Sequence, residues 1–566
     1  MGITNRINFR HVRGDMFGGL TAAVIALPMA LAFGVASGAG AASGLYGAVI
    51  VGFFAALFGG TPTLISEPTG PMTVVFTAVI AQLIASDPEN GMAMAFTVVM
   101  LAGFFQIIFG VLKLGRYVTL MPYPVISGFM SGIGIILITL QLGPFLGHAT
   151  PKGGVIGTLT SLPELVQTLD PVEVALGVVS LAVLFLVPKQ LKRWVPPQLL
   201  VLVGGTLLAL VLFPNADLRL IGEIPTGLPS LRMPTFQVSQ VQTMLVNGLV
   251  LGMLGCIDAL LTAMIADSVT RTQHDSNKEL IGQGIGNMMS GLFGGMPGAG
   301  ATMGTVVNIQ AGGKTALSGL VRAGILLVVV LWAAPLTKAI PLAVLAGIAV
   351  KVGFDILDWS FLKRAHNVSW KGTAIMYGVM FLTVFVDLIV AVGVGVFIAN
   401  ILTIDRLSRL QSEQVKTITD FDDDVAMSPE DKSLMDQANG RVLVFHLNGP
   451  MIFGVARAIS QEHTAMADHD VLIIDLQAVP YLGVTAALAL DNAIKDAHEA
   501  DRQVFLVGAR DKTLSRLEKL GALRSVPPDH LVETRTEALK ASLRLLAMMD
   551  GVEPSRIAVE PGATAL

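Results

Sequence analysis

The sequence predicts a polytopic α-helical membrane protein that continues into a small α/β domain, and three observations carry this prediction. Of the 566 residues, 53% are hydrophobic and only 14% are charged, whereas typical soluble domains are about 25% charged. Apolar stretches recur from Met16 to about Leu407, and beyond them the chain becomes polar. The last part alternates strand-like runs of β-branched residues with segments of helical spacing.

The membrane part is expected to cover residues 16–407, after a polar, basic N-terminal segment of residues 1–15. It holds roughly fourteen candidate spans, some of them shorter than the ~20 residues that a regular membrane-spanning helix needs. Lys and Arg gather at alternate ends of these spans. The positive-inside rule therefore places both termini and the α/β domain in the cytoplasm, in a multi-pass protein of the plasma (inner) membrane.

The C-terminal part begins with a charged linker, residues 408–438, and the α/β domain follows at residues 439–550. The runs "RVLVFHLN", "DVLIIDLQ" and "RQVFLV" predict strands of a mainly parallel sheet, because helical segments separate them. We expect the polar residues 551–566 to form a disordered tail.

Two segments of the membrane part are broken and polar where a regular span is expected. They read "SEPTGPMTVVFTAVI" at residues 66–80 and "GGMPGAGATMGTVVNIQAGG" at residues 294–313. When Thr73 is aligned with Thr305, Pro and Gly precede a short apolar helix in both segments. Paired, interrupted spans in matching positions indicate an inverted-repeat transporter with its substrate site at the midplane.

Two half-helices whose N-termini face each other would form an anion site without a cationic side chain. Their first-turn N–H groups lack intrahelical partners and carry the positive end of the helix dipole. Thr69 and Thr302 can add hydroxyl donors, while Gly70, Gly298 and Gly300 let backbone approach a small ligand closely. The alternative is that these glycines only allow close helix packing. The matched prolines and glycine clusters favour the anion site.

An intramembrane acid lies in the run "GCIDALLTAMIAD". Asp258 is flanked by apolar turns, and an ionisable residue at such depth is a functional candidate by default. Thr262 shares its helical face. Together with free carbonyls around Gly300, these groups are hard oxygen donors that suit Na⁺. The alternatives are a protonated Asp258 bonded to a neighbouring helix, or a proton relay. A Na⁺ ion beside the anion would cancel charge that neither could bury alone.

Other candidates carry less weight. Glu67 precedes the first half-helix, where a capping or gating role competes with ligation. The single cysteine, Cys256, lies in an apolar run and reads as a small buried hydrophobe. The sequence shows no Ser/His/Asp arrangement and no nucleotide-binding glycine loop, so we expect neither an enzyme nor an ATP-driven pump. We expect no organic cofactor and no nucleic-acid partner.

Four stretches together resemble the SulP (sulfate permease) anion transporters with a C-terminal STAS domain. They are "GDMFGGLTAAVIALPMALAFGVASG", "GGTPTLISEPTGPMTVV", "GCIDALLTAMIAD" and "GLFGGMPGAGATMGTVVN". The resemblance covers essentially the whole chain, and within the family the sequence is most similar to the sodium-dependent bicarbonate transporters of the cyanobacterial BicA type. It implies a seven-plus-seven inverted repeat with core and gate domains, and a homodimer formed through the STAS domain.

The resemblance also implies where the two ions bind. It places Na⁺ at Asp258, Thr262, Gly300, Ala301 and Thr302. It places bicarbonate between the half-helix tips, at Thr69, Gly70, Ala301 and Thr302.

Two departures from the wider family pattern, and one difference in the STAS loop, bear on function. Many relatives carry Gln after the proline of the first span, where this chain has Met29. Some animal members begin the second half-helix with Arg, and the comparable position here is near Thr302. Without that Arg, Na⁺ can supply the missing positive charge. This favours Na⁺ symport of a monovalent anion over transport of sulfate. The STAS loop Tyr481-Leu482-Gly483 lacks the Asp-Ser-Ser/Thr phosphorylation site of bacterial anti-sigma antagonists, which favours dimerisation over a phosphoswitch.

We therefore expect a secondary active transporter in which the Na⁺ gradient drives HCO₃⁻ into the cell by alternating access. The alternatives are a SulP carrier of sulfate or a dicarboxylate coupled to Na⁺ or H⁺, an anion channel, and a membrane-tethered signalling protein whose STAS domain does the work.

Overall fold

The computed structural model describes residues 4–5, 9–118, 122–188, 196–222, 229–333, 337–386, 388–412, 414–418, 427–452 and 469–551. The chain divides into two compact units, Met1–Ala399 and Asn400–Leu566. Apart from Gly551, the predicted tail of residues 551–566 lies outside the described residues.

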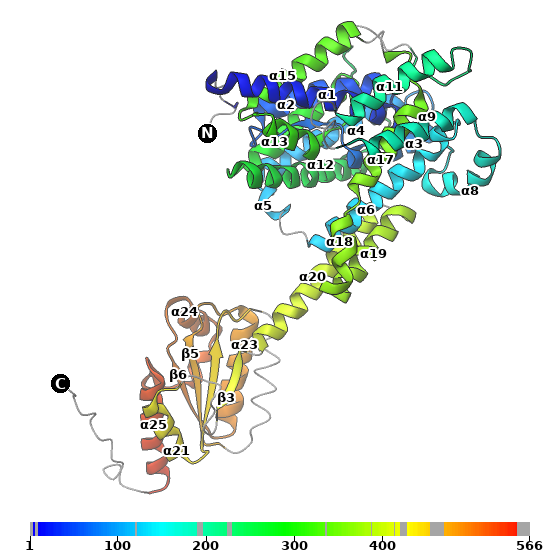
Figure 1. Cartoon of the computed structure of the whole chain (residues 1–566). Helices are drawn as coiled ribbons and strands as arrows, with labels where there is room; N and C mark the ends of the chain where they lie inside the picture. Colours follow the sequence, from blue (N-terminus) through cyan, green and yellow to red (C-terminus); the bar gives the residue numbers. More distant parts are fainter. Residues whose placement is uncertain are drawn as a thin grey trace. The chain divides into compact units, whose positions relative to one another are not determined.

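The first unit is built almost entirely of helices (Figure 1). In chain order its α-helices are α1 (Val12–Ala36), α2 (Ala41–Phe58), α3 (Gly70–Ser86), α4 (Gly91–Val111), α5 (Gly115–Val118), α6 (Tyr123–Leu140), α7 (Leu142–Phe145), α8 (Gly154–Gln167), α9 (Pro171–Leu186), α11 (Pro197–Leu212), α12 (Val241–Thr270), α13 (Ser276–Leu292), α14 (Thr302–Gln310), α15 (Ala316–Val328), α17 (Leu342–Ile356), α18 (Trp359–Val368) and α19 (Trp370–Phe385). Helix α20 (Leu388–Ser412) continues the chain past the boundary between the units.

Within the described residues, five helices are long and apolar enough to cross a membrane, and the pair α8 and α9, bent by 117°, could make a sixth. The five spans are Val12–Ala36, Ala41–Phe58, Gly91–Val111, Tyr123–Phe145 and Val238–Thr270. Shorter apolar helices include α3, α11 and α19. The prediction of roughly fourteen spans counted such short segments as well. The predicted fold class, a polytopic helical protein with an α/β domain, is confirmed.

Small residues let the helices of the first unit pack with their backbones in contact. An ideal Cβ at Gly103 of α4 would lie 2.4 Å from the carbonyl oxygen of Gly284 in α13. One at Gly284 would lie 2.5 Å from the carbonyl oxygen of Gly103. Such close approach is the usual way in which membrane helices gain contact area. It makes α13 a central support, packed on both α4 and α2.

Two very short strands cross inside this helical unit. β1 (Ser66–Glu67) pairs antiparallel with β2 (Ala299–Gly300), with Ser66 opposite Gly300 and Glu67 opposite Ala299. α3 begins three residues after β1, and α14 begins two residues after β2. Pro68 and Gly298 interrupt regular helix here, and the two segments satisfy each other's backbone groups instead. The alignment of Thr73 with Thr305 is confirmed, because each lies four residues after the residue that caps its helix.

The second unit is a five-stranded sheet of order β3-β4-β5-β6-β7, in which β3 is antiparallel and the other strands are parallel. Its strands are β3 (Val415–Ile418), β4 (Val442–Asn448), β5 (Val471–Ala478), β6 (Gln503–Val507) and β7 (Leu531–Val532). Its helices are α21 (Pro429–Ala438), α23 (Val484–Glu499), α24 (Asp511–Leu520) and α25 (Arg535–Met549). The predicted mainly parallel α/β domain is confirmed.

Both faces of this sheet are covered by helices (Figure 1). Side chains such as Leu472 and Ile474 pack with α23 and α24 on one face, while Val471 and Ile473 pack with α21 and α25 on the other. This alternation explains the continuous apolar runs of the strands. The range 408–438, predicted as a linker, contains the edge strand β3 and the packed helix α21. These segments are short and polar on their outer faces, so their sequence resembles a linker.

Candidate functional site

The crossing of β1 and β2 brings the N-termini of α3 and α14 together. Thr69 is the N-cap residue of α3, and Ala301 is the N-cap residue of α14. The Ala301 N–H donates to the carbonyl of Ile65 at 2.8 Å, and the Thr305 hydroxyl accepts from the Ile65 N–H at 3.0 Å. The second half-helix is therefore fixed directly to the segment that leads into the first.

The first turns of both half-helices carry N–H groups without partners in their own helix. The first backbone bond of α3 joins the Thr73 N–H to the Thr69 carbonyl at 2.9 Å. In α14 the Thr305 N–H donates to the Ala301 carbonyl at 2.9 Å. The earlier N–H groups of each helix are therefore available to an anion. Because both backbone groups of Ala301 are bonded, the available donors of α14 begin at Thr302.

Asp258 lies at the tip of the first half-helix and borders one cavity together with Thr302 of the second. It is buried on α12, and its carboxylate oxygen Oδ2 accepts a hydrogen bond of 2.7 Å from the Thr69 hydroxyl. One turn further on, the Thr262 hydroxyl donates to the carbonyl of Gly300 at 2.8 Å and lies 3.0 Å from the Thr302 hydroxyl. The structure thus gathers the oxygen atoms of the predicted cation ligands and links them to the predicted anion site. Ion binding at these residues stays a prediction.

The glycines of the two crossovers face protein atoms rather than open space. An ideal Cβ at Gly298 would lie 2.7 Å from the carbonyl oxygen of Glu67, and one at Gly300 would lie 3.0 Å from Cβ of Thr262. At Gly70 the nearest atom would be Cδ1 of Ile356, at 2.3 Å. Each glycine therefore allows the crossing segments and neighbouring helices to approach each other, which was the alternative. The approach of a ligand to their backbone stays a prediction.

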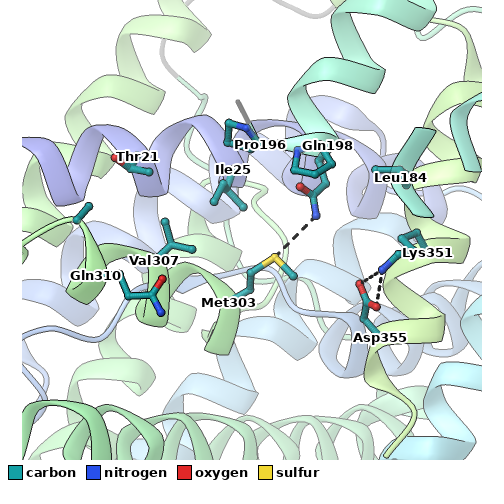
Figure 2. A pocket seen from close by; sticks show the side chains of 12 residues that line it. Thr21, Ile25, Leu184, Pro196, Gln198, Met303, Val307, Gln310, Lys351 and Asp355 are labelled. Atoms are coloured by element: carbon teal, nitrogen blue, oxygen red, sulfur yellow. Dashed lines mark hydrogen bonds and ion pairs between the residues drawn. The ribbon is translucent and has the colours of Figure 1, made fainter. Parts of the chain in front are cut away.

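Two cavities flank the first turn of α14. One, of about 410 Å³, is bordered by Asp258 and Thr302, together with Tyr123, Ser127 and Asp358. The other, of about 580 Å³, is bordered by Met303 (Figure 2). Its polar contacts are the amide of Gln198, 3.8 Å from the Met303 sulfur, and an ion pair between Lys351 and Asp355 at 2.5 Å. Consecutive residues of the half-helix thus border two different cavities.

A buried ion pair beside the crossover was missed by the sequence analysis. Arg322 of α15 pairs with the Glu67 carboxylate and donates to the backbone carbonyls of Ser66 at 3.0 Å and Ala48 at 3.2 Å. Glu67 therefore anchors β1, and no sequence observation had linked it to Arg322. A signal was present, since Arg322 is the one charge within the apolar run "ALSGLVRAGILLVVV".

A ladder of buried polar side chains on α13 was also missed. Glu279 accepts from the N–H groups of Gly60 and Thr61, at 2.9 and 2.8 Å. The remaining members contact both crossovers: Gln283 donates to the Ser66 hydroxyl at 2.6 Å, Asn287 bonds the N–H and carbonyl of Gly298 at 2.8 and 2.9 Å, and Ser290 donates to the Met296 carbonyl at 2.6 Å. Their spacing of three or four residues along "SNKELIGQGIGNMMS" is the signal that could have found them.

The α/β unit has a separate buried polar cluster. Asp475, in the middle of β5, accepts from Arg535 Nε at 2.9 Å and lies 3.1 Å from His446 Nδ1. Burial opposes ionisation of this carboxyl, but the hydrogen bonds from His446 and the Gln477 N–H and the charge of Arg535 outweigh it and hold its pKa below the usual value. The loop predicted to lack a phosphorylation site contacts Arg516 of α24. The Arg516 guanidinium lies 5.0 Å from the Tyr481 ring and donates to the Leu482 carbonyl.

Two half-helices that meet inside an apolar helix bundle, beside a buried carboxylate, define a membrane transporter of the inverted-repeat kind. The sequence comparison agrees: the chain belongs to the sulfate permease family, which matches residues 12–379, and a STAS domain matches residues 433–538. It is a transporter and not an enzyme.

Individual relatives extend this likeness to the full length. The chain is 66% identical over 544 residues to the "Bicarbonate transporter BicA" of Picosynechococcus sp., covering 95% of this chain and 96% of the relative. Among solved structures it is similar to the transmembrane domain of a cyanobacterial bicarbonate transporter BicA, with a TM-score of 0.66 and 69% identity over 69% of this chain and all of that one. SLC26A9 shares the fold, with a TM-score of 0.80 at 18% identity, over 96% of this chain and 92% of that one.

Proposed function

We propose that this chain is a Na⁺-coupled bicarbonate symporter. The observation that carries the proposal is the hydrogen bond between Asp258 and Thr69, because it joins the candidate cation ligand to the candidate anion site. Relatives named as bicarbonate transporters, 66% and 64% identical to this chain, indicate the anion.

The two ions would occupy adjacent positions. Bicarbonate fits between the half-helix tips, where the first-turn N–H groups of α3 and α14 and the hydroxyls of Thr69 and Thr302 can donate to its oxygens. Na⁺ fits the oxygen donors of Asp258, Thr262 and the Gly300 carbonyl, with Ala301 and Thr302 beside them.

The Asp258–Thr69 bond gives a physical reason for coupling. Without Na⁺, the Thr69 hydroxyl is engaged by the carboxylate, and the negative charge of that carboxylate repels an incoming anion. A Na⁺ ion at Asp258 would neutralise the carboxylate and compete for its oxygen atoms. The hydroxyl of Thr69 could then donate to bicarbonate instead. Each ion would therefore improve the site for the other.

The remaining expectations complete the proposal. Rocking of one half of the bundle past the other would expose the site to each side of the membrane in turn. The protein would lie in the plasma (inner) membrane with both termini and the STAS domain in the cytoplasm. The STAS domain would join two chains into a homodimer.

Uptake of radiolabelled bicarbonate by proteoliposomes, with and without an inward Na⁺ gradient, tests the function directly. We expect uptake to require Na⁺. An excess of unlabelled sulfate or dicarboxylate should not reduce it. Strong competition by sulfate would instead favour a sulfate carrier of the same family. Anion current without Na⁺ dependence would favour a channel. Either result would overturn the proposal.

A further inference from the structure

Two cavities lie toward opposite ends of the membrane-spanning helix α6. The cavity of about 410 Å³ is bordered by residues from its beginning, including Tyr123 and Met130. A larger cavity of about 970 Å³ is bordered by Ile136 and Leu140, near its end. Met130 and Ile136 are six residues apart, or about 9 Å along the helix axis at 1.5 Å per residue. The two cavities therefore approach each other from opposite sides of the membrane domain.

Two apolar side chains, Ile356 and Leu137, lie close to Gly70 in the layer between these cavities. An ideal Cβ at Gly70 would lie 2.3 Å from Cδ1 of Ile356 and 3.8 Å from Cδ2 of Leu137. Ile356 borders the smaller cavity, and Leu137 follows a residue that borders the larger one. Beyond Gly70, α3 continues into the larger cavity with Val74 on the same helical face.

Ile356 is held in this layer by the residue two positions on. Ile356 ends α17, and Asp358 then caps α18. The carboxylate of Asp358 accepts from the Tyr123 hydroxyl at 2.7 Å and the Ser127 hydroxyl at 2.8 Å, and its N–H donates to the Ser131 hydroxyl at 3.2 Å. All three partners lie on α6. The end of α17 is therefore clamped to α6, which also supplies Leu137.

We propose that the contact of Ile356 with the backbone at Gly70, beside Leu137, is the barrier that separates the ion site from the far side of the membrane. This inference rests on the proposed transport function. An apolar layer of this kind stops hydrated ions, because a charge cannot enter it without losing water. The barrier lies against the first residue of α3, so ions bound at the half-helix tips are one side chain away from the other cavity. Transport then requires Ile356 to leave Gly70 in each cycle.

A matched pair of substitutions tests the contact. Gly70→Ala adds a methyl group that collides with Cδ1 of Ile356, and we expect bicarbonate uptake to fall about tenfold or more, as overpacking would predict. Ile356→Val removes that Cδ1 atom, and the next atoms would lie at 3.7 and 3.8 Å, which is ordinary contact. The double variant Gly70→Ala/Ile356→Val should therefore return to the uptake of Ile356→Val alone. The control Gly70→Ala/Leu137→Val should stay low, since Leu137 is not the clashing group.

A shortened barrier should leak. Ile356→Ala should let bicarbonate cross proteoliposomes without Na⁺, at a rate about fivefold or more above that of the unaltered protein, because the apolar layer loses most of one of its two side chains. If the double variant stays inactive and Ile356→Ala shows no Na⁺-independent flux, the barrier is not at this contact.

Thiol labelling tests the barrier even if bicarbonate proves not to be the substrate. In a Cys256→Ala background, Ala78→Cys reports the larger cavity and Met264→Cys the smaller one. A membrane-impermeant maleimide should label each cysteine from one side only, and from opposite sides. Labelling of both from the same side would overturn the inference. Failure of the unaltered protein to take up bicarbonate would instead overturn the proposed function alone.

Discussion

Asp258 is the residue on which coupling depends. It is 8% exposed, and its carboxylate accepts a hydrogen bond from a neutral hydroxyl. A buried carboxylate is costly unless a cation or a proton neutralises it. In the proposed mechanism the neutralising cation is Na⁺, so the charge of this side chain and not only its shape matters.

Asp258→Asn should abolish Na⁺-dependent bicarbonate uptake, with a loss of about tenfold or more, while the protein stays folded. Asparagine can still accept a bond from the Thr69 hydroxyl, but it presents no charge to Na⁺. Uptake in proteoliposomes and the elution profile of the purified protein measure the two effects separately. Asp405→Asn is the matched control, because Asp405 is an exposed partner of Arg409 on α20 and such pairs contribute little. Uptake at the normal level in Asp258→Asn would contradict the sodium assignment.

At the scale of elements, the antiparallel crossing of β1 and β2 sets the distance between the two half-helices. Gly298 makes this crossing possible, because its missing Cβ would lie 2.7 Å from the backbone carbonyl oxygen of Glu67. Backbone cannot give way as a flexible side chain does. The buried polar side chains of α13 and the Arg322 side chain also hold this crossing in place, through hydrogen bonds to Ser66 and Gly298.

Gly298→Ala should therefore separate the half-helix tips and reduce uptake about tenfold or more, as small displacements of binding groups do. Gly378→Ala on α19 is the control, since its added methyl meets nothing within 4 Å. It should leave uptake intact and stabilise its helix by about 1 kcal/mol at most. Thermal unfolding in detergent and uptake in proteoliposomes check both. Full activity of Gly298→Ala would show that the crossing is not tightly constrained.

The half-helices could be predicted because proline and glycine interrupt an apolar pattern, and such an interruption is visible within a few neighbouring residues of the sequence. Asp258 and Thr262 could be paired because they are one helical turn apart. What could not be predicted is which distant groups meet. Arg322 lies 255 residues from Glu67, and Ile356 reaches Gly70 from another helix. Such contacts depend on how the helices pack, and no spacing along the chain encodes that.

In the α/β unit, Asp475 joins β4, β5 and α25 through His446 and Arg535. Because its pKa is lowered in the folded state, its contribution to stability is present above the unfolded pKa of about 3.9 and is lost as pH falls through the lower folded pKa. Amide exchange of β4 and β5 should therefore accelerate as the full-length protein is acidified below pH 4. Asp475→Asn should exchange faster already at neutral pH, with a loss of about 2 kcal/mol, and respond less to acid. The exposed control Asp436→Asn should behave like the unaltered protein, and equal acid responses in all three would contradict this role.

At the scale of the whole molecule, symport requires that the transporter move with both ions or with neither. The site offers a reason, because the carboxylate that attracts Na⁺ repels bicarbonate and holds the Thr69 hydroxyl. A site without Na⁺ therefore disfavours bicarbonate. A site without bicarbonate lacks one negative charge that would otherwise attract Na⁺. The barrier at Ile356 then has to open for the filled site and, on the return, for the empty site, but not for a site that holds one ion alone.

This coupling must be reciprocal at equilibrium. The factor by which saturating Na⁺ tightens bicarbonate binding must equal the factor by which bicarbonate tightens Na⁺ binding. Equilibrium binding of each labelled ion to purified protein, with the other ion present or absent, measures both factors, and we expect each to be about tenfold or more. In Asp258→Asn the bicarbonate factor should fall to one, because no carboxylate remains to be neutralised. Equally tight bicarbonate binding with and without Na⁺ in the unaltered protein would show that the two ions do not meet at this site, and the proposed symport would then need a different physical link.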